Sequence, residues 1–293
     1  MMAISMKQRA IRVKRKIERV GWTLIGIMAL VLVGVLLLAA VSENETLKDS
    51  IVTFIIVGFL AQIIDGALGM AYGVSSTTFL LSTGISPAAA SASVHVAEVF
   101  TTFVSGVAHW RLGNVDKSIF SRLVIPGILG GVTGAYILSN VSGDTIKPFI
   151  SFYLMLMGVR ILWKAFSRPP VIQTMTRHLF PLGLVGGFFD AIGGGGWGPV
   201  VTTTLVARGN EPRTTIGSVN TAEFFVTFAE SVTFLLAVKF SEYSTVILGL
   251  MIGGVLAAPM AAYVCKKLSA RKLMVVVGAL IVGLSLRTLI MTL

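Results

Sequence analysis

Cysteine and charged residues are scarce in this chain of 293 residues. The one cysteine, Cys265, cannot form an intramolecular disulfide and offers no metal site with cysteine spacing. Charged residues make up only 13 % of the sequence, about half of the roughly 25 % found in average soluble domains. Hydrophobic residues make up 55 %, and the mean hydropathy is +0.87. This composition excludes an ordinary soluble globular domain.

Acidic residues are fewer than basic ones, 13 against 24, which gives a net charge of +11. Such a balance can indicate a nucleic-acid partner, but the basic residues here lie in short segments that flank apolar spans. That distribution is typical of cytoplasmic loops in membrane proteins and leaves no basic soluble face for a duplex. We therefore expect no nucleic-acid partner. The basic segment 1–20 is expected to be a topology signal, with contact to anionic lipid as an alternative.

Long apolar runs are abundant, and most reach the length of about 20 residues that crosses a bilayer. They lie near residues 22–41, 90–108, 119–139, 147–163, 216–238, 243–264 and 272–292. The first run exceeds the roughly 7–15 residues of a signal-peptide core, so it is expected to remain as a helix. The sequence predicts an all-α polytopic membrane protein.

The chain also contains an internal repeat, found by shifting the sequence by 125 residues. Residues 65–103 begin DGALGMAYG and residues 190–228 begin DAIGGGGWG, and fifteen of the 39 aligned positions carry the same residue. In each copy, an apolar arm is followed by a glycine-rich break and then by a second short arm. Arms of about 14 residues are too short to cross alone, so each copy predicts a broken helical hairpin that enters the membrane and returns.

The charge of the loops predicts that the two repeats have opposite orientations. The acidic loop 42–50 is expected outside and the basic linker inside, so each hairpin makes no net crossing. The expected organisation is a cytoplasmic segment 1–20, an extra first transmembrane helix with its external loop (21–50), repeat 1 (51–166), a cytoplasmic linker (167–178) and repeat 2 (179–293). Paired interrupted segments in inverted halves are typical of a transporter's binding site.

The hairpin tips are the predicted binding site. Each second arm directs a helix N-terminus, with its partial positive charge and free N–H groups, into the membrane, which favours a small oxyanion. Helix packing by the glycines and local bonding of the threonines are the structural alternatives. Asp65 and Asp190 end the first arms, where they cap the tip or bind a cation. The predicted substrate-binding residues are Gly73, Ser75, Ser76, Thr77, Thr78, His95, Gly194, Gly195, Gly196, Trp197, Thr202, Thr203 and Asn220.

Ionisable residues lie within two of the apolar spans, where they are costly and often functional. Glu98 and Glu223 occupy equivalent positions of the two repeats, and Glu230 lies two turns beyond Glu223. We predict Glu98, Glu223 and Glu230 as proton-coupling residues; a polar bridge between helices is the alternative for the Glu98–Glu223 pair and for His95. Arg160 and Arg287 lie near span ends and are expected to extend to the interface.

The paired motifs DGALGMAYG…GISPAAASASVHVAE and DAIGGGGWGP…GNEPRTTIGSVNTAE resemble the TauE/SafE family of sulfite and organosulfonate exporters. The resemblance extends from about residue 51 over the rest of the chain. It implies a multi-pass protein of the bacterial inner membrane that moves a small sulfur oxyanion, such as sulfite or sulfoacetate, with coupling to protons. The N-terminus would be cytoplasmic and the C-terminus periplasmic.

Other functions remain open from the residues alone. A passive anion channel would keep the tips without a titratable pair, and the carried anion could be sulfate, thiosulfate or a carboxylate. An intramembrane protease would need facing aspartates or an activated nucleophile, which the pattern does not favour. We expect a small anion, protons and the lipid bilayer as partners, leave a homodimer open, and expect no cofactor, metal or catalytic residue.

Overall fold

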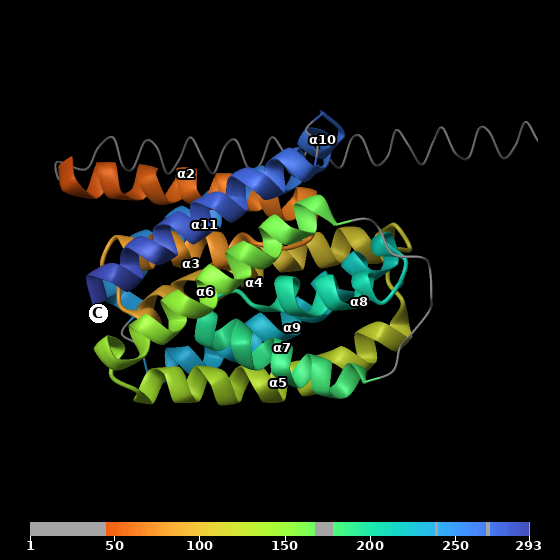
Figure 1. Ribbon diagram of the computed structural model, residues 1–293, viewed down its shortest axis with the longest axis horizontal. Helices are drawn as coiled ribbons and strands as arrows, with labels where there is room; N and C mark the ends of the chain where they lie inside the picture. Colours follow the sequence, from red (N-terminus) through yellow and green to blue (C-terminus); the bar gives the residue numbers. More distant parts are fainter. Residues whose placement is uncertain (1–44, 168–177, 238–239, 268–269, 293) are drawn as a thin grey trace, which may run out of the picture. The chain divides into compact units, whose positions relative to one another are not determined.

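The computed structural model describes residues 45–167, 178–237, 240–267 and 270–292 (Figure 1). The chain divides into two units, residues 1–49 and 50–293, and all the described helices except the start of α2 belong to the second unit. The predicted basic segment 1–20 and the predicted helix 22–41 lie outside the described residues.

Every regular element within the described ranges is a helix. The first half of the chain contributes α2 (Glu45–Leu68), α3 (Tyr72–Ser82), α4 (Pro87–Arg111), α5 (Lys117–Asn140) and α6 (Gly143–Phe166). The second half contributes α7 (Leu179–Gly193), the π-helical turn η1 (Gly198–Thr202), α8 (Thr203–Ala207), α9 (Pro212–Leu235), the 3₁₀ turn η2 (Phe240–Tyr243), α10 (Ser244–Lys267) and α11 (Ala270–Thr292).

The predicted spans after residue 51 each coincide with one of these helices, and their ends differ by four residues or fewer. The helix α2 is described from Glu45 on, so residues 45–50 of the segment predicted as a loop are helical. Helix starts follow local chemistry. Pro87 and Pro212 open α4 and α9, where proline needs no N–H partner, and Asp116 caps α5.

Both predicted breaks are present. The first lies between α2 and α3, where Gly69 and Ala71 have positive φ angles of 64° and 95°. The second lies between α7 and η1, where Gly194 and Gly195 have φ angles of 62° and 142°. The return arm α3 has 11 residues, roughly 16 Å at 1.5 Å per residue, which is too short to cross a hydrocarbon core of about 30 Å.

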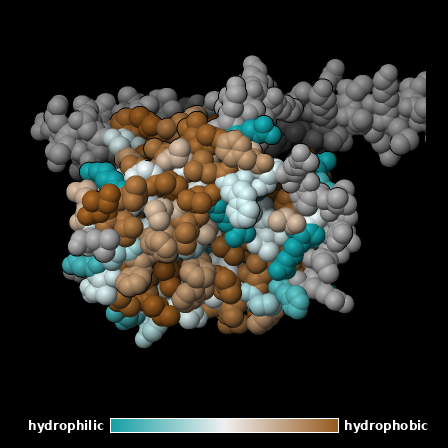
Figure 2. Space-filling view, viewed as in Figure 1, coloured by the Kyte–Doolittle hydropathy of each residue, from teal (hydrophilic) through white to brown (hydrophobic). Residues whose placement is uncertain are grey.

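The surface of the helices is apolar, as Figure 2 shows for one face. Large side chains are exposed there and elsewhere, with Phe149, Trp163 and Ile290 at 71 %, 75 % and 68 % exposure. Three of the described helical segments, Lys117–Asn140, Gly143–Phe166 and Met274–Thr292, are long and apolar enough to cross a membrane. An exposed apolar surface of this extent suits lipid rather than water. The fold is that of an all-α membrane protein.

Glycines bring the two hairpins close to neighbouring helices. A Cβ on Gly58 of α2 would lie 2.8 Å from Leu250 Cα of α10, and one on Gly130 of α5 would meet the Leu184 carbonyl of α7. The helix α5 also contacts α9, while α10 contacts α4 (Figure 1). The first arm of each hairpin therefore packs through small residues on a helix of the other repeat, α2 on α10 and α7 on α5. Such contacts are typical of membrane helix pairs.

Candidate functional site

The tips of the two hairpins touch each other. A Cβ on Gly73, at the start of α3, would lie 2.5 Å from Gly195 Cα, so only glycine fits this contact. Thr77 of α3 donates a 2.6 Å hydrogen bond to the carbonyl of Gly194. A Cβ on Gly198, at the start of η1, would lie 2.8 Å from the Cβ of Met70, so this glycine also packs against the first tip. The breaks in the two repeats thus form one contiguous buried structure, with a π-helical turn of a kind often found at functional sites.

Asp190 holds the second tip in its folded form. Its Oδ1 accepts hydrogen bonds of 2.6 and 2.9 Å from the N–H groups of Gly196 and Trp197, and its carbonyl accepts one from Gly195. Asp65 takes the equivalent place at the first tip, where its carboxylate accepts from the backbone N–H of Tyr72. The N–H groups predicted to face an anion are therefore bound, at the second tip, by the protein's own carboxylate.

His95 of α4 links this tip to α9. Its Nδ1 lies 2.7 Å from the Ser91 carbonyl, and Ser91 in turn donates to the carbonyl of Ala191 at 2.5 Å. Its Nε2 lies 2.7 Å from Glu230 Oε2 and 3.7 Å from Asp190 Oδ2. These three side chains are at most 1 % exposed, so the cluster is dry.

The neighbours of His95 bear on the protons that the His95–Glu230 pair can hold. A carbonyl only accepts, so Nδ1 of His95 carries a hydrogen where it faces the Ser91 carbonyl. Nε2 lies 2.7 Å from Glu230 Oε2, and the two groups form an ion pair when the imidazole is protonated. The pair is therefore a candidate proton site beside the hairpin tip.

A metal ion is the other occupant to consider. The ligand atoms of His95, Asp190 and Glu230 lie within 4.8 Å of one another. Two ligands of a tetrahedral zinc, at bond lengths near 2.0–2.1 Å, are roughly 3.3 Å apart. The 2.7 Å between Nε2 and Oε2 is shorter than that, so these two atoms lie closer together than two ligands of one zinc ion would.

The other half of the protein contains a neutral counterpart of this pair. Asn220 of α9 is equivalent to His95 in the repeat, and Ser105 of α4 is equivalent to Glu230. Asn220 Nδ2 donates to Ser105 Oγ at 3.2 Å. The same cross-helix contact thus occurs twice, ionisable in one half and uncharged in the other.

Glu98 and Glu223 lie near the same tips without being bonded to each other. Glu98 is 4 % exposed, its Oε2 has no hydrogen-bond partner among the described residues, and its Oε1 would lie 3.1 Å from a Cβ on Gly73. Glu223 is less buried and is close enough to interact electrostatically with Glu98 and Asp190. The predicted carboxylates and His95 therefore gather around one place, at the contact between α4, α9 and the tips.

The predicted hydroxyls divide into two groups. Thr77 is bonded across the tips, Thr78 bonds its own helix at Val74, and Thr203 Oγ1 lies 3.6 Å from Met70 Sδ. Buried hydroxyl oxygens without a partner among the described residues belong to Ser75, Ser76 and Thr202. The hydroxyls of Ser75, Ser76 and Thr202 can therefore bind a ligand, whereas those of Thr77, Thr78 and Thr203 stabilise the tips themselves.

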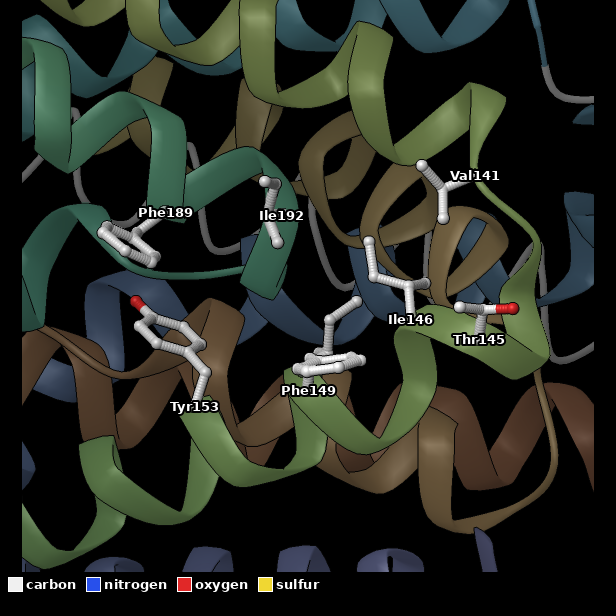
Figure 3. A pocket seen from close by; sticks show the side chains of 8 residues that line it. Val141, Thr145, Ile146, Phe149, Tyr153, Phe189 and Ile192 are labelled. Carbon is white, nitrogen blue, oxygen red and sulfur yellow. The ribbon is translucent and has the colours of Figure 1, made fainter. Parts of the chain in front are cut away.

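Tyr153 of α6 was missed by the sequence analysis because it lies within an apolar span. A Cβ on Gly196 would meet its hydroxyl, and its ring stacks on Phe189 with centroids 5.1 Å apart. The hydroxyl is buried and has no hydrogen-bond partner among the described residues. Figure 3 shows Tyr153 and Phe189 lining an apolar cavity of about 390 Å³ between α5, α6 and α7. A free donor therefore lies beside the second tip.

Comparisons with known proteins agree with these features. The family model described as "Sulfite exporter TauE/SafE" matches residues 54–288. A protein of Bacillus subtilis (strain 168), described as "Probable membrane transporter protein YtnM", is 44 % identical over 248 residues, which cover 82 % of this chain and 83 % of that protein. No solved structure matches the chain.

Proposed function

Because the chain belongs to the sulfite exporter TauE/SafE family, a family of membrane transporters, we propose that it is a secondary transporter that exports a small sulfur oxyanion with coupling to protons. Sulfite and organosulfonates such as sulfoacetate are the proposed substrates. The membrane is the bacterial inner membrane, with the N-terminus and the 167–178 linker in the cytoplasm and the C-terminus in the periplasm.

One observation carries this proposal: the buried His95–Glu230 pair lies beside Asp190, which holds the donors of the second tip. A sulfonyl or sulfite oxygen needs the same N–H donors that Asp190 now occupies. Substrate and Asp190 therefore compete for the N–H groups of Gly196 and Trp197. A protonated Asp190 binds these groups more weakly than a carboxylate does, because charge-assisted hydrogen bonds are roughly twice as strong as neutral ones.

Proton transfer then couples substrate binding to the release of the tip N–H groups by Asp190. His95 lies 3.7 Å from Asp190 and 2.7 Å from Glu230, so a small side-chain shift carries its Nε2 proton to either carboxylate. Protonation of Asp190 frees the tip for the anion, and its deprotonation returns the tip to the closed form. Tyr153, Ser75, Ser76 and Thr202 supply further donors for the substrate oxygens.

We further propose that the repeats 51–166 and 179–293 are inverted and give alternating access around the tips. The contacts support two pseudo-symmetric halves, because α5 on α9 has its counterpart in α10 on α4, and α11 on α3 has its counterpart in α6 on η1. The proposed opposite orientation of the halves rests on the charges of their loops. The helices α4 and α9, which bear His95 and the glutamates of the site, contact each other.

Transport by the purified protein tests the proposal. The protein is reconstituted in proteoliposomes, and uptake of labelled sulfite, sulfoacetate, sulfate and thiosulfate is measured with and without a pH gradient. We expect accumulation of sulfite or sulfoacetate above the equilibrium level only with the gradient. Flux of every anion down its gradient, with no accumulation at any pH difference, would instead identify a passive channel.

A further inference from the structure

Two cations lie on the C-terminal part of α6 without an acidic partner among the described residues. Arg160 and Lys164 are one helical turn apart and half-buried. Both ion pairs found among the described residues are made by His95, and neither involves Arg160 or Lys164. Like charges four residues apart on a helix repel each other, and burying a cation without a counter-charge is unfavourable. An anion between them would offset both costs.

Their neighbours are neutral groups on the second hairpin and the first tip. Arg160 Nη2 donates to Thr204 Oγ1 at 3.3 Å, and Lys164 Nζ lies 3.8 Å from Met70 Sδ. Thr203 Oγ1 lies 3.6 Å from the same sulfur atom. A thioether is a weak acceptor, so the ammonium group of Lys164 has no strong partner among the described residues.

The position of this cluster connects it to the tips. Met70 belongs to the first tip and lies against Gly198, where η1 begins. On α6, Tyr153 lies beside Gly196 of the second tip, and Arg160 and Lys164 follow it at intervals of seven and eleven residues. These intervals place the three side chains on one helix face. The face is a polar track in the otherwise apolar segment 152–166 of α6, and it leads from the tips to the end of α6 that joins the linker.

We propose that Arg160, Lys164, Thr203 and Thr204 form a second anion-binding site, which receives the substrate from the linker side before it reaches the tips. The inference rests on the proposed function. The ligand is a small oxyanion with at least two equivalent oxygens, because the guanidinium group presents paired N–H donors that match such oxygens. The ammonium group adds a second charge, and the threonine hydroxyls supply neutral donors. Two cations favour a dianion such as sulfite over a singly charged carboxylate.

The test compares substrate affinity from the two sides of the membrane. Initial uptake of labelled sulfite is measured in vesicles of both orientations for wild type, Arg160→Gln and Lys164→Gln. Loss of one charge-assisted hydrogen bond predicts a KM that rises roughly tenfold or more for sulfite offered from the linker side. From the other side KM should change less than about twofold, because the tips bind the substrate first there. Lys164→Arg should restore most of the affinity.

Lys147→Gln on the same helix and Arg287→Gln on α11 are matched charge-removal controls, and they should leave KM unchanged on both sides. An equal loss of maximal rate from both sides with unchanged KM would show a structural role and overturn the inference. A lipid phosphate could satisfy the same cations, so the assay is repeated in phosphatidylcholine vesicles with and without phosphatidylglycerol. A KM effect that appears only with phosphatidylglycerol would assign the cations to lipid and also overturn it.

Equilibrium binding separates this inference from the proposed function. Purified protein in detergent is titrated with sulfite by calorimetry. Weaker binding by Lys164→Gln than by Lys147→Gln supports the site even if the wild type shows no proton-driven accumulation. Equal binding by all variants, together with proton-driven accumulation by the wild type, rejects the site and leaves the proposed function standing.

Discussion

Gly195 is the residue whose replacement tests the contact between the tips most sharply. Its φ angle is 142°, and a Cβ there would meet the backbone of Gly73 and the N–H of Val74. Gly195→Ala therefore carries two costs. An alanine in a backbone region this rare costs about 1–3 kcal/mol, and forcing a methyl group into a packed contact costs about 1–3 kcal/mol more. Backbone atoms cannot rotate away, so the tips must separate.

Gly84→Ala and Gly113→Ala separate the two costs. Both glycines have positive φ angles, of 96° and 69°, but a Cβ on either would meet nothing within 4 Å. We predict that Gly195→Ala is less stable than these controls by at least the packing term, about 1–3 kcal/mol. Thermal unfolding in detergent and sulfite uptake in proteoliposomes measure the effect, and uptake should be lost only in Gly195→Ala. A melting temperature and uptake equal to those of the two controls would refute the tip contact as a constraint.

Further predictions concern the carboxylates and donors around the site. Glu223→Gln should abolish accumulation driven by a pH gradient while exchange of substrate continues, and Glu98→Gln should have a milder effect; counterflow at two pH values measures both. Tyr153→Phe should raise KM for sulfite several-fold without lowering the melting temperature, because its hydroxyl bonds nothing else that is described. Hydrogen bonds from the backbone N–H of Thr214, and then of Arg213, lower the pKa of Glu211. Its cap on α9 therefore stabilises the protein at pH values above the unfolded pKa, and this contribution is lost as the pH falls through the folded pKa. Glu211→Gln should flatten the acid side of a plot of melting temperature against pH.

The helices and the two breaks could be predicted from the sequence because their signals are local. Apolar length gives the spans, and the glycine-containing segments 69–73 and 193–198 interrupt them at equivalent points of the repeat. Helix ends shifted by a few residues where capping decided them, as with Ser142 before α6. Packing by the tip glycines was the structural alternative to a binding site, and the contact between Gly73 and Gly195 is a packing contact of this kind.

The partners within the site could not be predicted, because they depend on how α4 packs on α9. Nothing local shows that His95 meets Glu230, 135 positions away, rather than Glu98 on its own helix. A weaker signal was present: positions 95 and 105 and their equivalents 220 and 230 are all polar, which fits two symmetric contacts. The carboxylate of Asp190 on the tip N–H groups was foreseen only as one alternative, since a cap and a ligand site use the same donors.

The polar track on α6 was missed for a different reason. Tyr153, Arg160 and Lys164 share a helix face, but two basic residues near the end of an apolar span usually reach the interface. The expectation for Arg160 followed that rule. In the structure its guanidinium group lies against Thr204 of the second hairpin, and only the three-dimensional position of α8 reveals this contact.

The most direct test of the central claim is sulfite accumulation by Glu230→Gln. The variant is compared with wild type and with Ser105→Ala, which alters the neutral counterpart of the His95–Glu230 pair. Accumulation driven by a pH gradient and counterflow without a gradient are measured in the same proteoliposomes. If the buried pair carries the coupling proton, Glu230→Gln loses accumulation but keeps counterflow, while Ser105→Ala keeps both. Accumulation by Glu230→Gln at the wild-type level, with the wild-type pH dependence, would contradict the account.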